Sequence, residues 1–379
     1  ISLGLVGSEM CIRDRHNSDD ATLLMREVTS FFIGCRVTGA TWSPGTRYTG
    51  DSSSEPWRLE IVVATEVQEL RLLQAMGPES PTSTNDLLGD TQVSINDVAW
   101  CMVPGYERYV AAAGEDGTLQ IWDLEPEGSG PVCHELYLDA PLLSVAFHSK
   151  MPKLLFVMDG SGVGRFVDWL ASIAPSASGS TDVRLAASIT DPVTLSAYAA
   201  EHADVRGAGA WQPQDAGVVG ALLGTHWCVW NVSSNGAARG AAAPEETGVV
   251  RGAEHLLQLP RGGSFRFSLT NPRLFAVSLP TLPGAAAATG VAPRSSGVAG
   301  VHVYDLALPT SPRQVDVHAQ TPYWGVRPVL LNATGTAEAG EPTVPAAYGV
   351  ASLDWLPHRV GAYDVLLVGV GRLVVPIPA

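Results

Sequence analysis

Small or apolar residues alternate with polar ones in six short stretches of the chain, and each stretch ends at an aromatic residue. An alternation with a period of two is typical of a β-strand that is buried on one face. We call the six aromatic residues the anchors: Trp42, Trp100, Phe147, Trp211, Phe267 and Trp355. The pattern predicts that each anchor occupies the same position in a repeated unit and that all six are buried.

A second pattern follows each anchor and consists of an apolar strand, a tight polar turn and another strand. Its clearest copy runs from Tyr109 to Leu124, with the turn at Asp116-Gly117. Asp-Gly between two alternating runs is a strong hairpin signal, because glycine accepts the positive φ that the turn needs. The other copies are Ile61–Leu73, Leu154–Trp169, Val218–Val232, Leu274–Leu279 resumed at Val301–Leu306, and Val365–Pro376. Six ordered copies predict a repeat made of antiparallel strands.

The spacing between anchors indicates insertions. Consecutive anchors are separated by 47 residues at the closest, from Trp100 to Phe147, and by 88 at the most, from Phe267 to Trp355. A propeller repeat needs roughly 40–45 residues. Segments rich in Gly, Ala, Pro and Ser cannot bury enough apolar area to offset the entropy of ordering. We expect them to form flexible rim loops: Ala75–Asp90, Ala171–Thr181, Ser233–Gly263, Pro280–Gly300 and Asn332–Ala347.

The N-terminal segment has a different character from the repeat. It lacks a starting Met, and the stretch from Leu5 to Arg15 looks like a translated sequencing adapter joined to a gene fragment. We interpret residues 1–15 as such an artefact, with a genuine disordered N-terminus as the alternative. Residues 16–36 are then predicted to be the remnant of a preceding blade and linker, and residues 37–379 the propeller.

Charge and composition exclude some classes of partner. The 379 residues include 23 basic and 38 acidic side chains, for a formal net charge of −15. Nucleic-acid affinity depends on neutralising phosphates, so we expect no direct binding to nucleic acid. The five cysteines are too scattered for a disulfide framework or a C-x-x-C site. The best apolar run, Val365 to Val370 with its neighbours, is stopped by Arg372 well short of the roughly 20 residues of a spanning helix, so we expect no membrane insertion.

No sequence motif for catalysis, cofactors or metals is convincing. Gly369-Val370-Gly371 lacks the third glycine and the helix of a dinucleotide fingerprint, and Gly160-Ser161-Gly162 occupies a hairpin turn. No pair of histidines has zinc-site spacing. Glu245-Glu246 lies in loop-like sequence and is more typical of a solvated face than of an acid/base pair. We therefore predict no catalytic, cofactor or metal site and no small-molecule substrate.

The stretch from Gly114 to Asp123 resembles the signature of the WD40 family, which ends in a Trp-Asp pair. Here that pair is Trp122-Asp123, and Trp230-Asn231 and Tyr304-Asp305 are degenerate versions of it. The resemblance implies an all-β propeller of four-stranded blades. It implies structural roles for Trp122, Asp123 and Trp230, with the Trp122 indole packed between blades and Asp116 and Gly117 shaping the turn.

Several stretches are also similar, in the same order, to a WD40 nucleoporin of the Y-shaped nuclear pore scaffold. They are Arg36–Arg47, Ile95–Trp100 with Asp116–Leu124, Ser144–Phe166, Gly209–Val232 and Ser352–Ile377. This resemblance implies a non-enzymatic scaffold protein that supports nucleocytoplasmic transport of protein and mRNA. It would act at the nuclear pore complex of the nuclear envelope and dock a larger α-helical scaffold nucleoporin. It also implies a seventh blade before Thr22, so that six of seven blades are visible and the N-terminal one is missing.

Two other functions remain open from the residues alone. A WD40 substrate receptor of a cullin-type ubiquitin ligase often has Arg two positions after the Trp-Asp pair. Here Glu125 holds that place after Trp122-Asp123. A propeller hydrolase would need a nucleophile and a base within reach of each other, and the sequence shows no such constellation.

Overall fold

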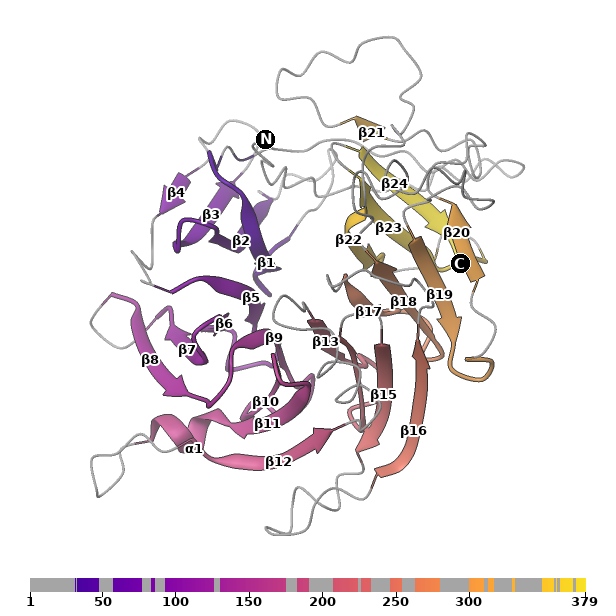
Figure 1. The fold of residues 1–379 in the computed structure, drawn as a ribbon. Coiled ribbons are helices and arrows are strands. Elements are labelled where there is room, and N and C mark those ends of the chain that lie inside the picture. Colours follow the sequence, from indigo (N-terminus) through magenta and orange to yellow (C-terminus); the bar gives the residue numbers. More distant parts are fainter. Residues whose placement is uncertain are drawn as a thin grey trace, which may run out of the picture.

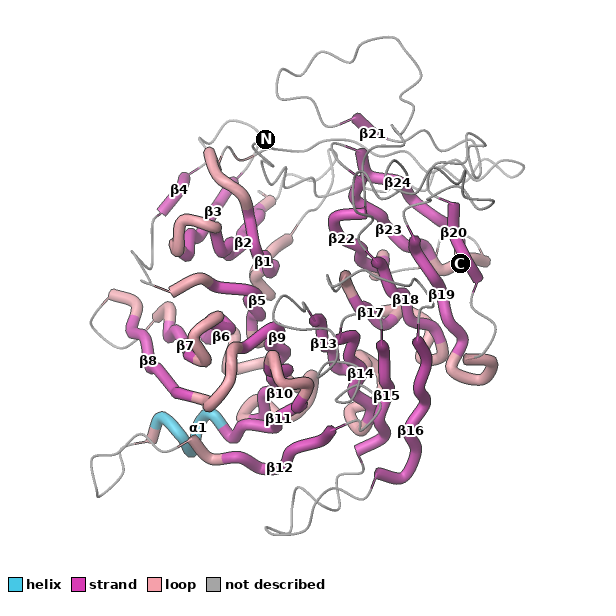
Figure 2. The backbone as a smooth tube through the Cα atoms, in the orientation of Figure 1, coloured by secondary structure: helices cyan, strands magenta, loops and turns pink. Residues whose placement is uncertain are grey.

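The computed structural model describes the repeat as strands with one short helix. The described residues are 31, 33–47, 57–76, 83–85, 93–125, 130–174, 183–190, 207–223, 226–232, 246–253, 263–279, 300–309, 313–316, 329–330, 350–357, 359, 362–370 and 373–379. Within them, β1 to β24 form six four-stranded antiparallel sheets, and α1 (Trp169–Ile173) is the one helix. Figure 2 shows this dominance of strand over helix.

The six sheets follow one another around a common centre, as Figure 1 shows, and we call them blades 1 to 6 in chain order. Blade 1 contains β1 (Val37–Trp42), β2 (Arg58–Thr65), β3 (Leu70–Met76) and β4 (Ser83–Asn85). Blade 2 contains β5 (Ile95–Trp100), β6 (Tyr109–Gly114), β7 (Thr118–Asp123) and β8 (Val132–Tyr137). Blade 3 contains β9 (Leu142–Phe147), β10 (Leu154–Asp159), β11 (Val163–Asp168) and β12 (Leu185–Thr190).

The C-terminal half has the same plan. Blade 4 contains β13 (Gly207–Trp211), β14 (Val218–Leu223), β15 (His226–Val232) and β16 (Glu246–Ala253). Blade 5 contains β17 (Phe265–Phe267), β18 (Leu274–Leu279), β19 (Gly300–Asp305) and β20 (Arg313–Asp316). Blade 6 contains β22 (Val350–Trp355), β23 (Val365–Val370), β24 (Leu373–Pro378) and, outermost, β21 (Val329–Leu330). The fold is therefore an all-β, WD40-type propeller, as the sequence predicts.

Each anchor is the last residue of the innermost strand of its blade. Trp100, Trp211, Phe267 and Trp355 are buried. The prediction of burial is wrong for Trp42 and Phe147, which are only half-buried. Trp42 packs on the face of blade 1 that points away from blade 2, where no other described blade covers it. Phe147 lies at the margin of the core between blades 2 and 3 and meets the Trp169 ring edge-on, with 6.0 Å between ring centroids.

The core is divided among the joints between blades. In β6, Val110 and Ala112 face a cluster shared with blade 1, whereas Ala111 and Ala113 face a cluster shared with blade 3. Because successive side chains of a strand point to opposite faces, one buried strand serves two joints. Comparable clusters join blades 3 and 4, 4 and 5, and 5 and 6. This division explains why the second strands of the repeat are apolar at nearly every position.

Blade 1 carries a sixth cluster that contains no described residue of another blade. Phe31 and Ile33 are buried in it against Leu59, Ile61 and Val63 of β2. The Arg71 Nη1 atom also donates a hydrogen bond of 2.9 Å to the Ile33 carbonyl. The part of the predicted 16–36 linker that the structure describes therefore packs on blade 1. Residues 1–30, including the predicted adapter, lie outside the described residues.

The outer strand of blade 6 comes from upstream of its inner strand. β21 pairs with β24 at Val374 and Leu373, so the spatial order is β21-β24-β23-β22. Beyond that pairing, Pro376 and Pro378 occupy β24 two residues apart. Proline has no N–H to offer a neighbouring strand, and it is tolerated at the edge of a sheet. The outermost strand of the last blade is therefore the short β21, which precedes the other three strands of that blade in the chain.

The expected rim loops contain some regular structure. β16 lies inside Ser233–Gly263 and begins at Glu246, and β4 lies inside Ala75–Asp90. Ala171 to Ile173 belongs to α1, and Gly300 begins β19. An outer strand has a neighbour on one side only, so the backbone hydrogen bonds to that neighbour, rather than an apolar alternation, define it. Most residues of Pro280–Gly300 and all of Asn332–Ala347 lie outside the described residues.

Candidate docking surface

The hairpin turns after the second strands follow the chemistry expected from the sequence. Gly117 has a φ of 92°, and the Asp116 carboxylate accepts hydrogen bonds of 2.8 Å from the Thr118 N–H and hydroxyl. In blade 3 the equivalent glycine is Gly162, with a φ of 82°. There the buried Asp159 holds the turn and forms a 2.8 Å ion pair with Arg165. These polar groups stabilise turns and do not converge on a site.

The other predicted blade residues are also distributed over the fold. Trp122 lies in the cluster between blades 1 and 2, and Trp230 lies in the cluster between blades 3 and 4. Asp123 is buried and its carboxylate lies 3.2 Å from the Arg108 guanidinium, which stacks over the Tyr109 ring. Trp122 and Trp230 thus hold neighbouring blades together, while Asp123 acts within blade 2.

Polar residues on the inner strands connect blades 2, 3 and 4. The Ser144 hydroxyl donates a 2.7 Å hydrogen bond to the Asp97 carboxylate and accepts one of 3.0 Å from the Gly209 N–H. Burial raises the pKa of Asp97, although the Arg266 charge and the Ser144 and Val145 donors oppose this shift. Within the described residues, no group of three or more His, Cys, Asp or Glu side chains could hold a metal ion. The hydrogen bonds among Asp97, Ser144 and Gly209 therefore have a structural role, which is to connect blades 2, 3 and 4.

A more extended polar network joins the first turns of consecutive blades, at the end of the sheets where each anchor lies. The His148 Nε2 atom lies 3.0 Å from the Ala216 carbonyl of blade 4, while Nδ1 accepts hydrogen bonds of 2.9 Å from the Lys150 and Met151 N–H groups. Burial lowers the pKa of His148, and the Lys150 charge adds to this shift, whereas the Ala216 carbonyl opposes it. His148 is therefore held as the neutral tautomer with its proton on Nε2.

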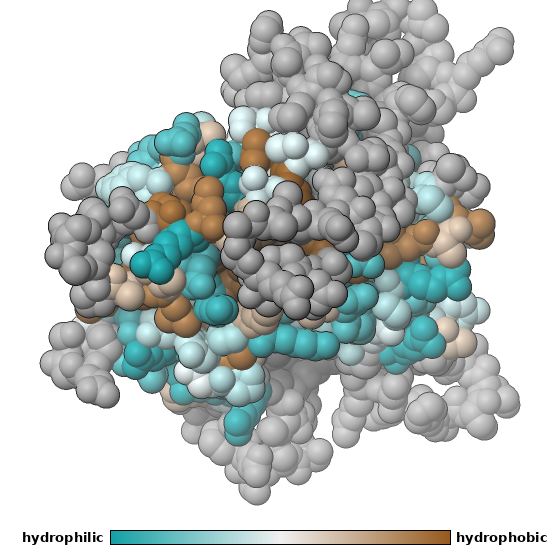
Figure 3. All heavy atoms as spheres, turned by 90° about the horizontal axis from the view of Figure 1, so that it is seen from below, coloured by the Kyte–Doolittle hydropathy of each residue, from teal (hydrophilic) through white to brown (hydrophobic). Residues whose placement is uncertain are grey.

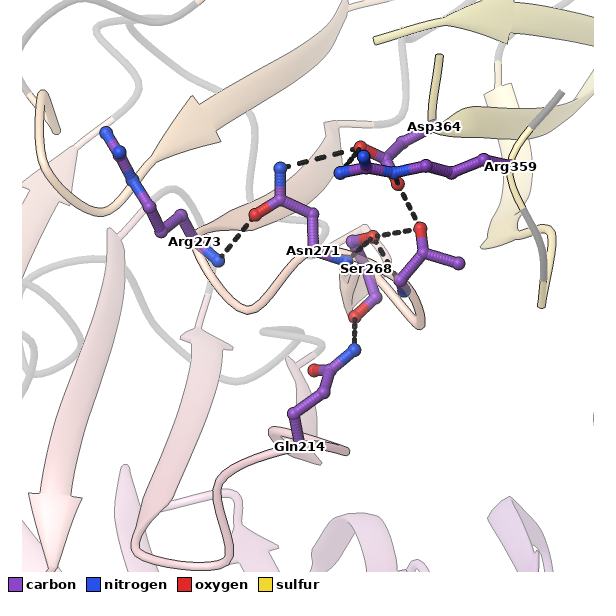
Figure 4. A network of polar contacts seen from close by, with 7 residues as sticks. Gln214, Ser268, Asn271, Arg273, Arg359 and Asp364 are labelled. Carbon is purple, nitrogen blue, oxygen red and sulfur yellow. Dashed lines mark hydrogen bonds and ion pairs between the residues drawn. The ribbon is translucent and has the colours of Figure 1, made fainter. Parts of the chain in front are cut away.

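The network continues from blade 4 to blade 5. The Gln212 side-chain amide donates a 3.1 Å hydrogen bond to the Pro272 carbonyl, and the Gln214 amide donates one of 3.4 Å to the Ser268 carbonyl. The Ser268 hydroxyl in turn accepts hydrogen bonds of 3.2 Å and 3.0 Å from the N–H groups of Thr270 and Asn271. Figure 4 shows the contacts that run from Gln214 through Ser268 toward blade 6.

Asp364 is the centre of the network in blade 6, and only 5% of its side chain is exposed. Its carboxylate accepts hydrogen bonds from the Thr270 hydroxyl and, at 3.5 Å, from the Asn271 amide of blade 5. The Nε atom of Arg359, in the same blade, donates a hydrogen bond of 3.3 Å to the Asp364 carboxylate (Figure 4). A buried carboxylate is stable only with such partners, so Asp364 locks the turns of two blades in one geometry.

A bidentate ion pair lies beside this network. The Arg273 Nε and Nη2 atoms donate hydrogen bonds of 3.0 Å and 2.7 Å to the Asp305 carboxylate. The Ala307 N–H, and then Arg273, lower the pKa of Asp305. Side-chain exposure is 58% for Arg273 and 32% for Asp305, so the guanidinium is the outer member of the pair.

Large apolar side chains project from the same turns. Leu269 lies between Ser268 and Thr270 and is 40% exposed, Tyr363 precedes Asp364 and is 47% exposed, and Leu308, after β19, is 62% exposed. We define the turn platform as Leu269, Arg273, Leu308, Arg359 and Tyr363. Figure 3 shows that, on the side it displays, apolar residues reach the surface in separate patches among polar ones. Single exposed apolar residues are common on protein surfaces, so what distinguishes these three is the hydrogen-bonded frame of turns that carries them.

The sequence pattern did not single out the turn platform. Polar residues follow the anchors at Gln212-Pro213-Gln214 and at Ser268 to Asn271, which is a signal for a turn. Nothing in that signal indicates that Thr270 and Asn271 would meet Asp364, which lies more than ninety residues further along the chain.

The geometry defines the class as a WD40-type β-propeller protein. Its sequence is similar to nucleoporin Nup37 of Mus musculus, at 24% identity over 269 residues that cover 71% of this chain and 68% of the relative. Nup37 of Homo sapiens is 25% identical over 268 residues, with the same coverage. The WD40 domain of Toxoplasma gondii coronin is 12% identical, with a TM-score of 0.49 and coverage of 94% of this chain and 72% of that one. No protein-family model matches the chain.

Proposed function

We propose that this protein is a non-enzymatic scaffold nucleoporin of the nuclear pore complex. The observation that carries the proposal is the similarity to Nup37 over 71% of the chain, together with a WD40-type propeller whose polar side chains hold blades and turns together. In this role the protein acts at the nuclear envelope, within the Y-shaped scaffold, and supports the transport of protein and mRNA. Its partner is a larger α-helical scaffold nucleoporin.

In this proposal the propeller docks its partner through a surface that is already ordered before binding. Networks such as the one around Asp364 fix the turns before a partner arrives, so little conformational entropy is lost on binding. Propeller faces are large enough for an interface of standard size, about 1,600 Å² in total. The protein then works by holding a partner in position and not by transforming it.

The charge of the chain supports a protein partner over nucleic acid. A net charge of −15 repels phosphates, so a pore role through direct RNA binding is disfavoured. Among the described residues, no helix is long and apolar enough to cross a membrane.

The test is to tag the full-length protein in its own cells, localise it and identify the chains that co-purify. We expect a punctate nuclear rim and recovery of scaffold nucleoporins. A diffuse cytoplasmic signal with cullin-type ubiquitin ligase subunits in the purified material would overturn the proposal and favour a substrate-receptor role. Recovery of neither class from cells that express the protein would also contradict it.

A further inference from the structure

We infer that a crevice between blades 3 and 4 binds the side-chain carboxamide of a glutamine that a partner protein supplies. The crevice has a volume of about 210 Å³ and lies along β15 of blade 4. Its lining includes Met158 and Gly162 of blade 3 and Ala221, Leu223, Cys228 and Trp230 of blade 4. This inference goes beyond the proposed function, because it names a site and the chemical group that the site accepts.

The crevice contains a hydrogen-bond donor that the fold leaves unused. Trp230 is 3% exposed, and its indole Nε1–H has no hydrogen-bond partner among the described residues. A buried N–H without an acceptor is unfavourable and rare in folded proteins. The side chains of Ala221 and Leu223, which also line the crevice, offer no acceptor. An occupant that brings an oxygen acceptor is therefore favoured.

Blade 2 shows which group satisfies the same donor elsewhere in the chain. Trp122 is the equivalent of Trp230, because each pairs with a valine of the second strand of its blade. The Trp122 Nε1–H donates a 3.4 Å hydrogen bond to the side-chain oxygen of Gln120. Gln120 is only 3% exposed, so its carboxamide is buried beside the indole. A glutamine carboxamide is thus an acceptor that fits this position of the repeat.

Blade 4 has a cysteine in the place of that glutamine. Cys228 precedes Trp230 by two residues and pairs with an alanine of the second strand, as Gln120 does in blade 2. In blades 3 and 5 the same place is taken by Arg165 and His302. Cys228 has the shortest side chain of these four residues, and the crevice lies beside it. A short side chain next to a tryptophan leaves both the space and the unused donor.

The lining of the crevice favours a neutral side chain over an ion. None of the described residues that line it is Asp, Glu, Lys or Arg. Burying a charge beside apolar groups such as Met158 and Leu223 is costly when no opposite charge is present. The volume is also below the roughly 300–1,000 Å³ of pockets for drug-sized ligands. His226, which is half-buried, lies at the hairpin end of the crevice, where a partner side chain would enter.

The direct test uses two small probes of the same length. N-acetylglutamine amide carries the carboxamide, and N-acetylglutamate amide carries a carboxylate in its place. Each probe is titrated into the isotope-labelled full chain, and NMR follows the indole N–H signal of Trp230, which is assigned by its loss in Trp230→Phe. We expect a saturable shift of this signal with the glutamine probe and at least about tenfold weaker binding of the glutamate probe.

Substitutions of Cys228 assign the binding to the crevice. Cys228→Gln supplies the carboxamide from within the chain, so it should shift the Trp230 indole signal without a probe and block the glutamine probe. Cys228→Leu fills the space without an acceptor and should block the probe alone. Cys228→Ala is the matched control, since it keeps the space open and should leave the affinity unchanged. Thermal unfolding of every variant shows whether the fold is intact.

Three outcomes would overturn the inference at the level of the probe: no saturable shift in the wild type, equal affinity for both probes, or binding that survives Cys228→Leu. In cells, tagged Cys228→Leu should recover less of at least one partner than Cys228→Ala does, and equal recovery would show that no partner uses the crevice. If the wild type binds the glutamine probe but recovers no pore subunit, the proposed function is wrong and the site in the crevice stands.

Discussion

The joint between blades 1 and 2 and the joint between blades 5 and 6 are stabilised in different ways. The first contains a cluster of buried residues that includes two tryptophans, Trp100 and Trp122. A 3.1 Å hydrogen bond from the backbone N–H of Trp100 to the Thr41 hydroxyl also crosses it. The second has an apolar cluster too, but adds two donors from blade 5 to the buried carboxylate of Asp364.

The two kinds of joint contribute different things: apolar packing contributes mainly to the free energy of unfolding, and hydrogen bonds to a buried carboxylate mainly fix the positions of the turns. Apolar packing, which dominates the joint between blades 1 and 2, supplies a large free energy that depends little on direction. Hydrogen bonds to a buried carboxylate add less net free energy but require fixed distances and angles. The joint between blades 5 and 6 is therefore the one that can present turns in a defined arrangement. Two changes at these joints test the contrast directly, and two smaller ones extend it to the joints of blades 3 and 4 and of blades 4 and 5.

Trp122→Ala should have the largest effect on the free energy of unfolding. Removing a large buried aromatic side chain from a core costs about 3–5 kcal/mol, through lost burial and the cavity that remains. Denaturant unfolding monitored by circular dichroism measures this loss. Tyr137→Ala is the control, because its exposed ring should contribute no more than about 0.5 kcal/mol. A loss below about 1 kcal/mol for Trp122→Ala would mean that packing does not dominate this joint.

Asp364→Asn should cost about 1–3 kcal/mol, because the Thr270, Asn271 and Arg359 donors lose a charged acceptor in a buried position. The same change should loosen the turn platform, which hydrogen exchange of the Thr270 and Asn271 amides would detect. Asp305→Asn is the matched control, since Asp305 is more exposed and its loss should be smaller. Equal losses for the two variants would contradict the central place given to Asp364.

His148 makes the joint between blades 3 and 4 sensitive to acid. Its pKa in the folded chain lies below the ordinary value of 6.5, so the unfolded chain binds the proton more readily. This contribution to stability is complete above pH 6.5 and is lost as the pH falls below that value toward the folded pKa. Protonation would remove the acceptor that Nδ1 offers to Lys150 and Met151.

The measurement is the midpoint of urea unfolding between pH 7.5 and 5, compared with His148→Asn. Asparagine keeps an acceptor near the Nδ1 position and does not titrate, so the variant should show a flatter dependence on pH. A variant as steep as the wild type would show that other groups govern the acid sensitivity of the fold.

Gln214→Ala should have the smallest effect, about 0.5 kcal/mol, because it removes one long hydrogen bond of 3.4 Å to the Ser268 carbonyl. The change in midpoint of thermal unfolding measures it. A loss as large as that of Asp364→Asn would show that the polar network acts as one cooperative unit from blade 4 to blade 6.

Much of the fold follows from local pattern. The six anchors mark the ends of the innermost strands, and the hairpin signal at Asp116-Gly117 falls at a turn with a positive φ at Gly117. These features depend on residues close together in sequence. The outer strands were harder to predict: β16 has no clean alternation, and β21 is two residues long. Both strands are defined by their backbone pairing, β16 with β15 and β21 with β24. The sequences of β15 and β24 do not indicate which segment pairs with them.

The sequence by itself determined the strand repeat and the antiparallel hairpins, because alternation and turn chemistry are local properties. Only the tertiary structure decided which side chains meet between blades. The contacts of Asp364 with Thr270 and Asn271 join residues 94 and 93 positions apart, and no periodicity encodes them. The burial of Trp100 was likewise decided by packing between blades 1 and 2, whereas Trp42, on the other face of blade 1, is only half-buried.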